Sequence, residues 1–120
     1  MGFLDINFKL KIIFDGCTQL HDVSDELFAS VTTVGFYSFR NCKNLRADNL
    51  DLYNATIVGN YAFYNCKGIN TVTIGENVNT IGTYAFANCS ALEEVIWHTD
   101  KSSVTIGTSA FPAGCVHNYR

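Results

Sequence analysis

A short block of residues recurs along the chain, and its spacing constrains the fold more than any other feature of the sequence. The block has the pattern aliphatic-Gly-x-x-Ala/Ser-Phe-x-Asn-Cys-x-x-Leu, with clear copies at 34–45, 58–69 and 81–92 and looser ones at 14–20 and 106–116. Its phenylalanines recur every 23 to 25 residues, and every cysteine of the chain also belongs to a block. A fixed period of this length is typical of solenoid proteins. The residues concerned are Phe14, Phe39, Phe63, Phe86 and Phe111, with Cys17, Cys42, Cys66, Cys89 and Cys115.

Segments of strand character lie between the blocks. Residues 72–74 and 92–97 follow the period of two that a strand requires, and 50–52 repeats the pattern after an insertion. Each repeat unit is therefore expected to contain one short strand and, opposite it, a tight helical or 3₁₀ segment. One unit cannot bury its apolar face alone, so neighbouring units must stack. The sequence thus predicts an α/β repeat solenoid with one short parallel strand per turn.

Stacking places equivalent side chains above one another, about 4.8 Å apart. The phenylalanine column then becomes an aromatic spine, in which each buried ring contributes about 2–3 kcal/mol. The Ala or Ser before the last four of these phenylalanines leaves room where the turns crowd together. The block glycine allows either a positive φ or a close approach of backbone at a corner. We expect one domain over 1–120 with about five turns, in which 1–13 forms an N-terminal cap.

The cysteines permit more than one interpretation. Cys17 with His21, or Cys115 with His117, could hold a metal, and the thiols could be redox-active. However, no Cys-x₂-Cys pair of the kind that structural zinc sites use is present, and all five thiols share one block position. A ladder of buried thiols acting as small apolar groups fits that spacing better. The histidines accompany no nucleophile motif. We therefore expect no catalytic residue, no metal and no cofactor.

The composition excludes several classes of function. The net charge is −3, and the eight basic residues are spread along the chain, which argues against nucleic acid as a partner. Arg40, Lys43, Arg46 and Lys67 follow the blocks and are expected to be ordinary solvated side chains. No apolar stretch is long enough to insert into a membrane. Residues 1–11 lack the features of a secretory signal, so the sequence leaves an intracellular and an exported protein both open.

Residues 74–92, with the text IGENVNTIGTYAFANCSAL, closely resemble the BspA-like class of leucine-rich repeats. The resemblance covers the chain from about Phe14 to Cys115, although that family usually has proline where Gly75 stands. It implies a leucine-rich-repeat horseshoe without catalytic residues. Members are often surface proteins of bacteria and protozoa that bind host or matrix proteins. The resemblance therefore implies a cell-surface or secreted protein that works in protein binding or adhesion.

The outward side chains of the predicted strands form the candidate partner-binding face, because side chains alternate along a strand. The face is polar and slightly acidic, and it includes an isoleucine and a tyrosine. We expect a non-catalytic protein-binding or adhesion module, with an unidentified protein as partner. The alternative is an intracellular scaffold or a structural repeat protein that self-associates through its open ends. The candidate residues are Asn49, Asp51, Tyr53, Thr71, Thr73, Gly75, Glu94, Ile96 and His98, with Asp22, Ser24 and Glu26 in the first copy.

Overall fold

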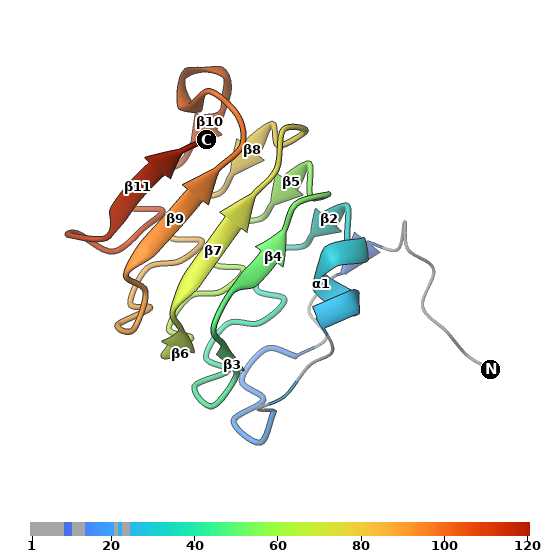
Figure 1. The fold of residues 1–120 in the computed structure, drawn as a ribbon. Coiled ribbons are helices and arrows are strands. Elements are labelled where there is room, and N and C mark those ends of the chain that lie inside the picture. The colour runs from blue at the N-terminus through green and yellow to red at the C-terminus, as the bar shows by residue number, and fades with distance from the viewer. Residues whose placement is uncertain (1–8, 11–13, 21, 23–24) are drawn as a thin grey trace.

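The structure is a computed structural model that describes residues 9–10, 14–20, 22 and 25–120 (Figure 1). Short strands follow one another around a solenoid, and helices are few. The helices are α1 (Asp25–Ser30) and the 3₁₀ helix η1 (Lys101–Ser103). The strands are β1 (Lys9–Leu10), β2 (Thr33–Val34), β3 (Arg46–Ala47), β4 (Leu50–Leu52), β5 (Ile57–Val58), β6 (Gly68–Ile69), β7 (Thr71–Ile74), β8 (Thr80–Ile81), β9 (Glu94–Trp97), β10 (Thr105–Ile106) and β11 (Val116–Tyr119).

The strands of the described residues form two main sheets. The front sheet has the order β11-β9-β7-β4, and the rear sheet has the order β1-β2-β5-β8-β10. A small third pair, β3 with β6, lies below the front sheet in Figure 1. Every pairing is parallel. This arrangement confirms the predicted solenoid of parallel strands.

The front strands β4, β7 and β9 lie where the sequence predicts strands. The rear strands, a second strand in each turn, were not anticipated. They are only two residues long, as in β8, and two residues are too few for an alternating pattern to emerge. The side of each turn opposite the front sheet therefore carries a parallel sheet as well as turns.

The first copy departs from the expected strand. Residues 25–30 form α1, so Glu26 is helical and the prediction of an outward-facing strand at 22–26 is wrong. Phe28 of this helix is buried, and its ring centroid lies 5.3 Å from that of Phe39. Burial of an aromatic ring against the spine outweighs extension of the sheet here. Asp22 is exposed, whereas Ser24 lies outside the described residues.

The predicted N-terminal cap is described only in part. Lys9–Leu10 forms β1, which pairs with β2 at the edge of the rear sheet. The rest of 1–13 lies outside the described residues.

The phenylalanine spine is confirmed. The five block phenylalanines stack in order, with ring centroids 5.2, 5.2, 5.1 and 5.3 Å apart. Phe39, Phe63 and Phe86 are completely buried. The small residues before them, Ser38, Ala62 and Ala85, are buried too. The column therefore lies in the hydrophobic core, together with the buried side chains of the front and rear strands.

The corner that carries the spine has an unusual backbone. Of the two roles open to the block glycine, the close approach is confirmed: a Cβ on Gly82 would lie 2.5 Å from the backbone nitrogen of Asn60. Positive φ falls on other block positions instead. Within the blocks, i→i−3 turns alternate with these left-handed residues in place of a continuous 3₁₀ helix. The left-handed residues are Tyr37, Tyr61, Tyr84 and Ser109, and Asn41, Asn65 and Asn88.

Candidate partner-binding face

The front sheet arranges the predicted face in rows, because its strands are parallel and in register. Asp51, Thr73 and Ile96 are register partners and form one outward row. Thr71 and Glu94 are partners in a second row. The alternate side chains, such as Val72 and Val95, are completely buried, as are Leu52 and Trp97. The structure thus brings residues from three repeats onto one surface, as the strand alternation predicts.

Thr73 belongs to the outward row but is largely covered from solvent. Its exposed fraction is 9 %, because it lies on a central strand between Asp51 and Ile96. Its hydroxyl donates a hydrogen bond to the side-chain oxygen of Asn49, at 2.9 Å. Both groups are therefore engaged with each other. The prediction that Thr73 offers an exposed hydroxyl is wrong, whereas Asn49 remains exposed.

Tyr53 and His98 meet across Gly75. Their ring centroids lie 5.4 Å apart, although β7 separates their strands. A Cβ on Gly75 would lie 1.7 Å from the carbonyl oxygen of Tyr53, so only glycine fits at this position. This close approach gives a physical reason for glycine where the family usually has proline. The missing side chain lets two partly exposed rings form one aromatic patch.

The acidic character of the face comes from Asp51 and Glu94. The Asp51 carboxylate accepts the backbone N–H of Tyr53 at 3.0 Å, and the Glu94 carboxylate accepts the side-chain amide of Asn118. Both acids are only partly covered. The face therefore combines negative charge with the apolar side chain of Ile96 and the aromatic patch.

A fourth strand of the face was missed from the sequence. No strand was expected at residues 116–119. They form β11 instead, which pairs with β9 and adds Val116 and Asn118 to the outward rows. The ring of Tyr119 stacks on Trp97 at 6.1 Å. The signal was the two-residue spacing of His117 and Tyr119, which occupy the inward positions that Val95 and Trp97 fill in β9.

The thiol ladder is buried at its centre, as expected. Cys42, Cys66 and Cys89 are completely buried, and each thiol donates to the carbonyl of the spine phenylalanine one turn before, at 2.8 to 3.1 Å. Burial raises the pKa of Cys42 to about 11 and that of Cys89 to about 12, and it raises the pKa of Cys66 further. Thiols protonated at neutral pH are poor nucleophiles and poor metal ligands.

Cys115 and His117 are the one thiol and imidazole pair that the described residues bring together, with Sγ and Nε2 3.6 Å apart. The indole of Trp97 donates to Nδ1 of His117 at 3.0 Å. Because indole can only donate, the neutral imidazole carries its proton on Nε2, which faces the thiol. His117 in this form cannot accept the thiol proton. His21, the proposed partner of Cys17, lies outside the described residues.

No group of three or more His, Cys, Asp or Glu side chains among the described residues is placed to hold a metal ion. In the same part of the chain, no helix has the length and apolar character needed to cross a bilayer.

The stacked parallel strands, the spine and the outward rows define a leucine-rich-repeat solenoid. The chain belongs to the BspA-type leucine-rich repeat family. The model of this family, described as "BspA type Leucine rich repeat region", matches residues 11–118 in six copies. Neither the curated proteins nor the solved structures contain a significant match. Leucine-rich repeats of this kind indicate a role in protein interaction, and they are typically non-catalytic binding modules.

Proposed function

We propose that this chain is a protein-binding module that holds its partner on the front sheet, in an adhesive role at a cell surface. The observation that carries the proposal is the set of outward rows, in which Asp51, Glu94, Ile96 and Tyr53 lie together on one surface. The sheet beneath them is rigid, because the alternate side chains are buried against the spine. A preorganised surface loses little side-chain and backbone freedom on binding, which favours affinity.

The chemistry of the face indicates what the partner presents to it. Asp51 and Glu94 favour lysine or arginine side chains, and charge complementarity fixes the register of an interface. Ile96 and the rings of Tyr53 and His98 offer an apolar contact at its centre. Aromatic anchors commonly dominate the binding energy of such interfaces. The partner is therefore a protein surface with basic residues around an apolar group.

Surface plasmon resonance against a panel of extracellular-matrix proteins tests this proposal. Ile96→Glu and Glu94→Lys alter the front sheet, and Ile57→Glu is the matched control, because Ile57 is an exposed isoleucine of the rear sheet. We expect the two front variants to weaken binding by about tenfold or more, as for a residue at the centre of an interface. The control should stay within about twofold of the unaltered chain. Circular dichroism first shows that each variant folds.

An equal loss of partner binding in the rear-sheet control Ile57→Glu would contradict the assignment of the binding site to the front sheet. Failure of the unaltered chain to bind any matrix protein would contradict the adhesive role.

The second candidate is a scaffold that assembles from copies of this chain. One observation favours it: β11 lies at the edge of the front sheet, and its Val116 and Tyr119 are exposed by 56 % and 49 %. An edge strand with apolar side chains can pair with another chain. Light scattering over a range of concentrations tests this, since self-association raises the average mass. Val116→Lys should then restore a monomer, and a constant monomeric mass of the unaltered chain would exclude assembly.

A further inference from the structure

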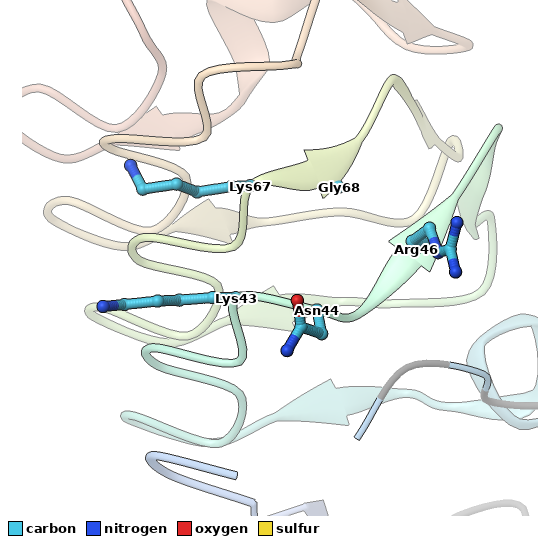
Figure 2. A pocket seen from close by; sticks show the side chains of 5 residues that line it. All are labelled: Lys43, Asn44, Arg46, Lys67 and Gly68. Carbon is cyan, nitrogen blue, oxygen red and sulfur yellow. The ribbon is translucent and has the colours of Figure 1, made fainter. Parts of the chain in front are cut away.

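Three basic residues line a hollow at the corner formed by β3 and β6. The hollow has a volume of about 370 Å³, and it is lined by Lys43, Asn44, Arg46, Lys67 and Gly68. Figure 2 shows the two lysine side chains extended in the same direction, away from Arg46, which lies on β3 on the other side of the hollow. Lys43, Arg46 and Lys67 are all exposed. This corner is separate from the candidate face of the front sheet.

The repeat architecture itself creates the cluster. Lys43 and Lys67 each follow the block cysteine, so they occupy equivalent positions in adjacent turns. Arg46 is the register partner of Gly68. A Cβ on Gly68 would lie 2.4 Å from the carbonyl oxygen of Leu45 and 3.0 Å from Cγ of Arg46. Glycine thus leaves the floor of the hollow open, and the arginine stem lies along it.

The three basic side chains have no ion-pair partner in the part of the chain that the structure describes. Arg40, by contrast, pairs with Asp15 at 2.7 Å. Lys67 donates to the carbonyl oxygen of Asn88 at 3.3 Å, which is a long and exposed contact. Lys43 and Lys67 extend side by side from adjacent turns, and their like charges repel one another. A segment with several acidic groups would reduce this repulsion at the lysines and, across the hollow, would accept charge-assisted hydrogen bonds from the guanidinium.

We propose that this hollow binds a short acidic segment of a protein partner, through aspartate or glutamate carboxylates. The charge of the whole molecule selects this class of anion. A long polyanion would extend past the three cations, across a protein whose net charge is −3. Charges beyond about 8 Å are screened at physiological ionic strength, so a small cluster acts only on the groups that enter it. The arginine fork matches a carboxylate with two parallel hydrogen bonds.

Fluorescence anisotropy with a labelled octaglutamate peptide, at low salt, tests this proposal. Lys43→Glu combined with Lys67→Glu should weaken binding by about tenfold, since each exposed charge contact contributes only modestly. Lys101→Glu combined with Arg120→Glu makes the same change of net charge in the C-terminal part of the chain, away from the hollow, and it should weaken binding by about twofold or less. An octaglutamine peptide should not bind. Ile96→Glu should leave binding to the peptide nearly unchanged, so this test is separate from that of the front sheet.

Three results would overturn the proposal. Equal loss in the two double variants would show that only the overall charge matters. Tighter binding of a heparin oligosaccharide or of RNA than of the peptide would assign the hollow to a different class of polyanion. Failure of octaglutamate to bind the unaltered chain would exclude an acidic segment. Lys43→Met with Lys67→Met, checked by circular dichroism, replaces the charge-reversed pair if that pair does not fold.

Discussion

Each of the three central repeats contributes one buried ring and one buried thiol to the core. Phe63 lies at the centre of the column, with rings of neighbouring turns 5.2 and 5.1 Å away on its two sides and the ring of Phe28 at 6.0 Å. Phe36, by contrast, is 58 % exposed, although it lies in the same block as the spine residue Phe39. The position within the block, rather than the residue type, decides which ring stabilises the fold.

Phe63→Ala should therefore lower the free energy of unfolding by about 3–5 kcal/mol, the cost of losing a buried ring and leaving a cavity. Phe36→Ala is the matched control and should cost about 1 kcal/mol or less. Urea denaturation followed by circular dichroism measures both values. A similar cost at the two positions would contradict the role of the spine.

The central thiols should react only after unfolding. Burial raises the pKa values of Cys66 and Cys89, and solvent does not reach either side chain. Iodoacetamide at pH 8 should alkylate the half-buried Cys17 and Cys115 at least about tenfold faster, because thiolate and access are both required. Mass spectrometry of the digested protein gives the rate at each site. Rapid modification of Cys66 in the folded chain would contradict the buried ladder.

At the scale of the element, β11 is attached to the solenoid through its inward residues. His117 accepts the indole hydrogen bond of Trp97, and Tyr119 stacks on the same indole. Protonation of His117 at Nδ1 would place two N–H groups face to face. Burial, followed by the charge of Lys101, lowers the pKa of His117. The neutral form is therefore the one that holds the strand.

The stability of the fold should consequently depend on pH below neutrality. Since the folded pKa lies below the unfolded value of about 6.5, this contribution is complete above that pH. It should be lost as the pH falls from there through the folded pKa. Denaturation at pH 7 and pH 5 measures the change, which should be smaller in His117→Gln. An NMR titration of the His117 ring that gives a midpoint above 6.5 would contradict this account.

The whole molecule is a stack in which each turn contacts only its neighbours. Central turns have a neighbour on both sides: Phe39 donates its backbone N–H to Ala62, and Phe63 donates to Ala85, each at 2.7 Å. The turn of Phe14 is bonded to the next one through Ser38, at 3.1 Å. Stability in such a stack is a sum of repeat and neighbour terms, so opening begins at the ends.

Hydrogen exchange should reveal this gradient. The amide of Phe63 should be protected at least about tenfold more strongly than that of Phe14, because opening the end turn disrupts only one interface. NMR after dilution into D₂O measures each rate. Uniform protection along the spine would show that the solenoid unfolds in a single cooperative step.

Much of this fold could be predicted, because the same sequence pattern recurs in each turn and therefore favours the same local structure each time. The spine, the thiol ladder and the strands β4, β7 and β9 all follow from the period and from alternation. The first copy could not be predicted in this way. There, burial of the Phe28 ring against Phe39 stabilises a helix more than pairing in the front sheet would stabilise a strand. The candidate face was found from alternation, but the coverage of Thr73 depends on Asn49, which lies 24 residues away.

By itself, the sequence determined the period, the buried column and the outward set of front-strand residues, because each depends on local spacing. Only the tertiary structure decided the contacts between turns. Gly75 admits the backbone of Tyr53, so the rings of Tyr53 and His98 meet across it. Arg46 is paired with Gly68, 22 residues further on, although the blocks of these turns are 24 residues apart. Such differences between strand register and block spacing arise when whole turns pack against each other. The sequence of a single repeat does not reveal them.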